Sequence, residues 1–266
     1  MKIGCQTYTW EMLGDAWHGR VTDLLDMVAE AGYAGIEITN TMIGEFADRP
    51  RDFAGELARR GLELAAFAYA STSGFSNPAQ AASDLAGANR WLAFLGEFPG
   101  VQLGLGGAAS ADPKLRRVKL DLAIGMYNAI GERAAAAGVV VNVHPHSHFG
   151  SLLETAEEYD YLLARLDPAI RFGPDTGHIV RGGQDLLTCL RRCLPRISHL
   201  HLKDADAAGV WQPMGQGMCD FPAVLELLTA SGYDGWVVCE EESELARQDG
   251  LAAIKHNRAY LRTLGQ

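Results

Sequence analysis

The chain has 266 residues and is 48% hydrophobic, enough to bury a large core and close to the roughly 250 residues of one (β/α)8 barrel. Its net charge of -10, from 33 acidic and 23 basic residues, argues against a nucleic-acid partner, because no broad basic surface is left to neutralise phosphates. The five cysteines include no CxxC pair, which argues against a disulfide framework. No uncharged apolar run reaches the roughly 18 residues of a membrane span, so we expect a cytoplasmic protein.

Short runs rich in Val, Ile and Leu alternate with longer segments of helical period along the whole chain. The runs predict strands near residues 2–8, 35–39, 62–69, 100–105, 138–144, 169–175, 196–202 and 235–241. The other segments predict helices near residues 20–32, 50–60, 78–97, 115–137, 153–166, 183–194, 220–231 and 246–263. Alternating strands and helices imply parallel strands with helical crossovers. We therefore expect an α/β fold, a single (β/α)8 TIM barrel over residues 1–266.

Four consecutive strands in the second half of the chain carry polar residues on the face predicted to point inward or at their ends. These residues are Asn142, His144, Asp175, His199, His201 and Glu240. In a barrel of this kind the active site lies at the C-terminal ends of the strands. Pointing a carboxylate or an imidazole into the barrel is costly unless the group is paired or binds a metal. The pattern therefore predicts one site for a divalent metal.

Asp175, His201 and Glu240 are the predicted metal ligands, because they end neighbouring strands at matching depth. His144 is the predicted fourth ligand. Imidazole and carboxylate groups suit Mn²⁺, Co²⁺, Mg²⁺, Fe²⁺ or Zn²⁺, and Mn²⁺ is the ion that we expect. His178 lies too far beyond Asp175 to share its strand face, so we predict that it contacts the substrate.

Several other residues leave alternatives open. Glu37 ends the second strand and is either a structural carboxylate or, as we expect, a substrate contact. His199 is either a buried hydrogen-bonded histidine or a substrate contact. Trp211 lies in the loop after the seventh strand, where a lid could close over a ligand. Residues 241–242 are interpreted as a solvated acidic run, and His148 as a surface residue.

At these positions the sequence resembles the xylose isomerase-like TIM barrel superfamily of sugar phosphate isomerases and epimerases, over essentially the whole chain. Members bind a metal through Glu, Asp, His and Glu on strands five to eight, and the resemblance places the last three on Asp175, His201 and Glu240. The chain departs from epimerases at strand five, where His144 precedes proline in place of glutamate, so that His144 or His146 would replace that ligand. Its motifs are most similar to those of inosose dehydratase-like members.

The resemblance implies a divalent-metal-dependent isomerase or epimerase of a keto sugar or keto polyol, acting by proton abstraction next to a metal-bound carbonyl. Glu240 or His146 is the expected base, and His178 and Lys203 would orient substrate oxygens. A lyase of the inosose dehydratase type, or one that cleaves 3-keto C-glycosides, would use the same enolisation. An endonuclease IV-like repair nuclease is disfavoured by the acidic charge. A metal-free binding subunit is a further alternative, and a homo-oligomer or a partner subunit is left open.

Overall fold

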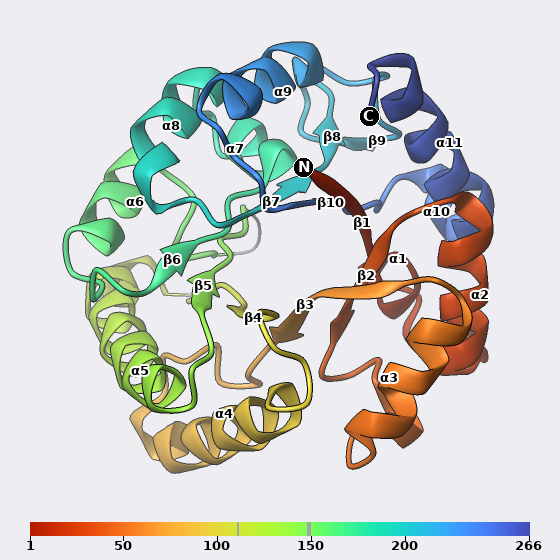
Figure 1. Cartoon of the computed structure of the whole chain (residues 1–266). Helices are drawn as coiled ribbons and strands as arrows, with labels where there is room; N and C mark the ends of the chain where they lie inside the picture. Colours follow the sequence, from red (N-terminus) through yellow and green to blue (C-terminus); the bar gives the residue numbers. More distant parts are fainter. Residues whose placement is uncertain (111, 148–149) are drawn as a thin grey trace.

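The computed structural model describes residues 1–110, 112–147 and 150–266, and its helices form a ring around parallel strands (Figure 1). The main sheet of these residues has the strand order β6-β5-β4-β3-β2-β1-β10-β7. Its strands are β1 (Lys2–Gln6), β2 (Gly35–Thr39), β3 (Glu63–Tyr69), β4 (Gln102–Leu105), β5 (Val141–Val143), β6 (Arg171–Phe172), β7 (His199–Leu202) and β10 (Trp236–Cys239). Parallel bridges between Phe172 and Ile197 and between Asp175 and His201 join the two ends of this order. The predicted barrel is confirmed, and His148 lies outside the described residues.

The helices cover the outside of the strands, where they bury apolar faces. Along β7, Leu200 and Leu202 are fully buried, while the alternate residues His199 and His201 face the barrel interior with Glu37. The α-helices are α1 (Tyr8–Glu11), α2 (Val21–Ala31), α3 (Pro50–Arg59), α4 (Ala81–Leu95), α5 (Arg116–Ala136), α6 (Ala156–Leu163), α7 (Thr176–Arg181), α8 (Leu186–Cys193), α9 (Phe221–Ala230), α10 (Glu244–Gln248) and α11 (Gly250–Thr263). No helix among them has the length and apolar character needed to cross a bilayer.

Several predicted elements have different boundaries in the structure, such as the sixth strand, predicted over residues 169–175 and observed as Arg171–Phe172. The first strand stops at Gln6 instead of continuing to residue 8, because the chain turns into α1 at the end of the barrel. The last predicted helix is divided into α10 and α11 at Asp249, whose backbone is extended with φ -152°. The Asp249 carboxylate accepts the backbone N–H of Ala252 at 2.9 Å and so begins α11 as its N-cap.

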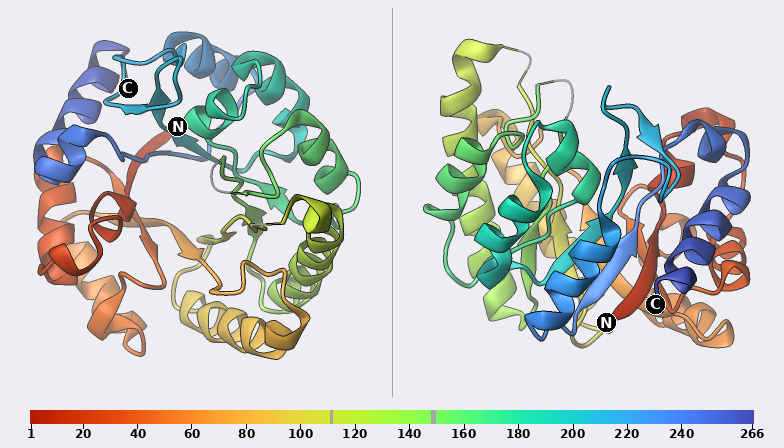
Figure 2. Two further views of the ribbon diagram at one scale, coloured as in Figure 1. Left: turned by 180° about the vertical axis from the view of Figure 1, so that it is seen from behind. Right: turned by 90° about the horizontal axis from the view of Figure 1, so that it is seen from above.

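The loop after β7 contains a small hairpin that the sequence did not predict, formed by β8 (Asp204–Ala205) and β9 (Trp211–Gln212). Figure 2 shows it at the end of the barrel opposite the N-terminus. The buried Asp204 carboxylate accepts backbone N–H groups of Gly215, Gly217 and Cys219 at 2.9, 2.9 and 3.0 Å. These charge-assisted bonds hold the following loop against the barrel.

Candidate metal centre

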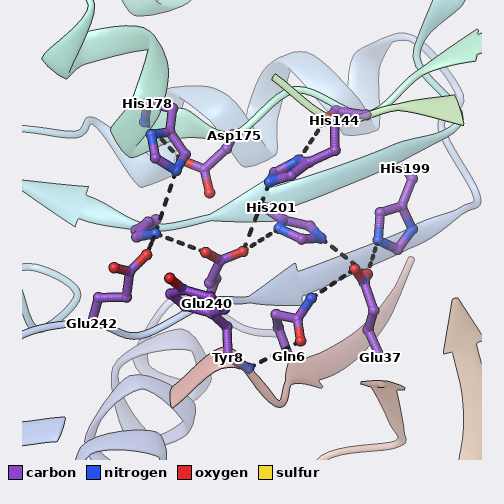
Figure 3. Close-up of polar contacts among 12 residues, drawn as sticks. Gln6, Tyr8, Glu37, His144, Asp175, His178, His199, His201, Glu240 and Glu242 are labelled. Carbon is purple, nitrogen blue, oxygen red and sulfur yellow. Dashed lines mark hydrogen bonds and ion pairs between the residues drawn. The ribbon is translucent and has the colours of Figure 1, made fainter. Parts of the chain in front are cut away.

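Four side chains from the C-terminal ends of consecutive strands meet inside the barrel (Figure 3). Each offers one ligand atom, and these atoms lie within 4.8 Å of one another; the residues are His144, Asp175, His201 and Glu240. Strand pairing produces this arrangement. The His201 N–H donates to the Pro174 carbonyl at 2.9 Å, and the Glu240 N–H donates to the Leu202 carbonyl at 3.0 Å. Neighbouring strand ends are therefore in register, as the metal-site prediction required.

Two ligand atoms of this cluster, Nε2 of His144 and Oδ2 of Asp175, are buried and have no hydrogen-bond partner among the described residues. Nδ1 of His144 lies 2.9 Å from the Gly173 carbonyl, so Nδ1 carries the proton and Nε2 presents a lone pair. Burial lowers the pKa of His144 to about 4, which keeps the ring neutral. Burial also raises the pKa of Asp175 to about 7, although Lys203 opposes this shift. A divalent ion would satisfy both atoms, so the donor set fits a metal.

Glu240 is held by two neighbours inside the cluster. Its Oε2 lies 2.6 Å from Nδ1 of His201, and its Oε1 accepts from Nζ of Lys203 at 2.7 Å. Burial opposes ionisation, but Lys203 and His201 hold the pKa of the Glu240 carboxyl well below its usual value. Glu240 is therefore a charged carboxylate, which suits contact with a cation, and both of its oxygens are bonded to protein groups in this structure.

The interpretation of residues 241–242 as a solvated acidic run is wrong. Glu241 is 2% exposed and accepts the Ser243 backbone N–H and the Asn257 amide. Glu242 forms an ion pair with Lys203, which is itself 1% exposed. Glu242 lines the cavity beside the cluster, whereas Glu241 lies against α11, where Asn257 donates to it.

A cavity of about 140 Å³ lies against the cluster. On one side it is lined by His144, His201 and Glu240, and on the other by small residues of β3, β4 and the turn after β4, including Ala66 and Gly104. Pockets for drug-sized ligands are usually about 300–1,000 Å³. The cavity therefore suits a small ligand whose polar atoms face the cluster.

Four of the predicted substrate or catalytic residues line this cavity and three do not. Glu37, His146, His199 and Glu240 are part of its wall. The other three lie outside its lining; they are His178, Lys203 and Trp211. The Trp211 ring lies 4.3 Å from Nζ of Lys203 and 5.0 Å from the His178 ring. The hairpin that carries Trp211 therefore covers these two buried side chains, and their contact with a substrate stays a prediction.

The cavity also contains polar residues from the first half of the chain that the sequence analysis did not select. Gln6, Glu11 and Thr39 line it. Glu11 accepts hydroxyl groups of Thr39 at 2.6 Å and Thr41 at 2.5 Å. Gln6 and Thr39 end β1 and β2, so the rule that polar strand ends mark a site would have identified both.

The sequence of this chain is similar to a protein family model and to curated proteins of known activity. A family model described as a xylose isomerase-like TIM barrel matches residues 25–264. An inosose dehydratase of Geobacillus thermodenitrificans is 35% identical over 169 residues, which cover 56% of this chain and 56% of that protein. An inosose dehydratase of Lacticaseibacillus casei is 35% identical over 151 residues, covering 50% of each chain. This chain thus spans about half the length of the curated relatives that it matches.

Solved structures with the same fold include several sugar epimerases. The 3-keto-D-glucoside 4-epimerase of E. coli has a TM-score of 0.79 at 21% identity and covers 99% of both chains. The D-psicose 3-epimerase of Clostridium cellulolyticum H10 has a TM-score of 0.80 at 16% identity, covering 100% of this chain and 98% of its own. A protein named IolI with a bound zinc atom has a TM-score of 0.82 at 15% identity, and the match covers 99% of this chain and 98% of that protein. At these identities the likeness shows the fold alone.

Proposed function

Because this chain belongs to the xylose isomerase-like TIM barrel family, we propose that it is a divalent-metal-dependent isomerase or epimerase of a small keto sugar or keto polyol. The observation that carries the proposal is the buried ligand cluster, in which Nε2 of His144 and Oδ2 of Asp175 lack hydrogen-bond partners among the described residues. The similar proteins include inosose dehydratases and a psicose epimerase, whose names denote keto polyols and keto sugars, and this supports the substrate class.

We propose that one ion is held by four residues and that the ion is Mn²⁺, with Co²⁺, Mg²⁺, Fe²⁺ and Zn²⁺ as alternatives. The four residues are His144, Asp175, His201 and Glu240. When bound, the ion supplies Lewis-acid chemistry that favours loss of a proton next to a carbonyl group. A cytoplasmic location is part of the proposal, since all five cysteines are free and buried.

We assign proton removal to His146. It lines the cavity, and its ring lies 4.7 Å from that of His144, so it reaches the space beside the cluster. Glu240, the other predicted base, is assigned to the ion, and its Oε1 accepts from Nζ of Lys203. Lys203 therefore serves to keep Glu240 ionised and in place, which is a positioning role.

A dehydratase is the second candidate, and the inosose dehydratases at 35% identity favour it. Such a lyase would begin with the same proton abstraction and then expel a β hydroxyl group instead of returning a proton to carbon. A carboxyl group near the departing oxygen would assist this step. Glu242 lines the same cavity beside Lys203 and could supply that group.

The test is hydrogen exchange with a panel of keto sugars and inososes in deuterated water. We expect the Mn²⁺-loaded protein to introduce deuterium next to the carbonyl of at least one compound, and we expect a chelator to stop the exchange. Exchange without loss of water supports the isomerase or epimerase, and loss of water supports the dehydratase. Full activity in the chelated protein would contradict the proposal, as would no exchange with any compound.

A further inference from the structure

Glu37 ends β2 inside the barrel and is 3% exposed. Its Oε2 lies 2.5 Å from Nε2 of His199 and 3.0 Å from Nε2 of His201, and its Oε1 accepts from Nε2 of Gln6 at 2.9 Å (Figure 3). Burial opposes its ionisation, but His201 and His199 keep the pKa of the Glu37 carboxyl below its usual value. Both oxygens of a charged carboxylate are thus already bonded to protein groups.

His201 lies between Glu37 and the metal cluster. Its Nδ1 is 2.6 Å from Oε2 of Glu240, so Nδ1 is the ring nitrogen on the cluster side. Its Nε2, on the opposite side of the ring, faces Glu37. A histidine that ligates a metal through one nitrogen usually donates the other N–H to a carboxylate or carbonyl, which selects the tautomer and orients the ring.

We propose that Glu37 is a positioning residue for the metal: it accepts the Nε2–H of His201, so that Nδ1 presents its lone pair to the ion. This inference rests on the proposed function, because it requires His201 to be a ligand. It replaces the expectation that Glu37 contacts the substrate. Glu37 acts on the ion only through His201.

The same three side chains, Glu37, His199 and His201, also lie close enough to hold an ion of their own. Their atoms are, however, already bonded to one another at 2.5 and 3.0 Å. In the ligand cluster, by contrast, Nε2 of His144 and Oδ2 of Asp175 have no hydrogen-bond partner among the described residues. The contrast between satisfied and unsatisfied atoms assigns the ion to the cluster and a supporting role to Glu37.

Gln6 anchors Glu37 from the neighbouring strand. The two residues are paired in the register of β1 and β2. Oε1 of Gln6 accepts the Tyr8 backbone N–H at 3.1 Å and the Thr7 hydroxyl at 3.2 Å, so its amide is held with Nε2 toward Glu37. The orientation of His201 is thereby tied to the backbone at the end of β1.

The experiment is titration of Mn²⁺ into the whole protein and into Glu37→Gln, which keeps the size of the side chain but removes its charge. We expect one ion per chain in both, with affinity about 10- to 100-fold weaker in Glu37→Gln. We expect Glu37→Asp, which keeps the charge on a shorter side chain, to recover part of the loss. Glu11→Gln is the matched control, because Glu11 lines the same cavity but bonds to Thr39 and Thr41. The Mn²⁺ affinity of this variant should equal that of the wild type.

A second measurement needs no variant: nitrogen NMR of the Zn²⁺-loaded wild type should show His201 protonated at Nε2. Wild-type affinity in a folded Glu37→Gln would overturn this inference alone, as would His201 protonated at Nδ1. Two ions per wild-type chain, with one lost in Glu37→Gln, would also overturn it and establish a second metal site. A wild-type protein that binds no Mn²⁺ would overturn the proposed function as well, so the two failures are distinguishable.

Discussion

Asp175→Asn is expected to abolish metal-dependent turnover and to weaken Mn²⁺ binding by more than about 100-fold, beyond the usual effect of losing a supporting residue. The two oxygens of Asp175 have separate tasks. Oδ1 accepts the His178 backbone N–H at 2.8 Å and caps α7, and an asparagine caps a helix equally well. Oδ2 is buried and has no hydrogen-bond partner in the part of the chain that the structure describes, and in Asn its position is taken by a nitrogen that cannot ligate.

The matched control is Asp185→Asn, because Asp185 caps α8 through the Thr188 backbone N–H at 2.8 Å but is exposed and outside the ligand cluster. It should keep wild-type metal affinity and turnover. Calorimetric titration with Mn²⁺ and the deuterium-exchange assay measure both variants. If Asp175→Asn folds and binds Mn²⁺ as the wild type does, Asp175 is not a ligand.

Lys203→Met is expected to lower the free energy of unfolding by about 3–5 kcal/mol, the usual range when one partner of a buried ion pair is removed. Lys203 is 1% exposed and pairs with Glu240 at 2.7 Å and with Glu242, whose side chains are 5% and 12% exposed. Methionine fills a similar volume but leaves two carboxylates without their cation. Urea denaturation of the metal-free protein measures the change, and excess Mn²⁺ should restore part of it by binding the folded state.

The control for this change is Lys255→Met. Lys255 pairs with Glu30 at 2.5 Å, but the two side chains are 43% and 58% exposed. Solvent screens such a pair, so its loss should alter the free energy of unfolding by less than about 1 kcal/mol. Equal effects of the two substitutions would show that the ion pairs of Lys203 do not stabilise the barrel.

The barrel could be predicted from the sequence because its strands are buried and short. In β10 the run Val237-Val238-Cys239 is buried on both faces, and a continuous apolar run is typical of a parallel strand. The ligand cluster could be predicted for a related reason. Glu240 directly follows such a run and Asp175 comes three residues after the buried Phe172, and the C-terminal ends of parallel strands meet at one end of a barrel.

The surroundings of the cluster could not be predicted in the same way. The acidic run at residues 241–242 has no local feature that separates a solvated turn from a buried one, and its burial depends on Lys203 and Asn257. Trp211 lies in a loop of suitable length for a lid, but the antiparallel pairing of β8 and β9 places it over Lys203.

The amino-acid sequence alone determined the repeat of strands and helices and the four strand ends that carry the proposed ligands, because periodicity and burial are local properties of a segment. Only the tertiary structure decided which atoms of those side chains have hydrogen-bond partners. Glu37 and His201 are 164 residues apart and meet only because β2 and β7 face each other across the closed barrel. Contacts across a barrel depend on its closure and on the register of its strands, so no local pattern in either strand predicts them.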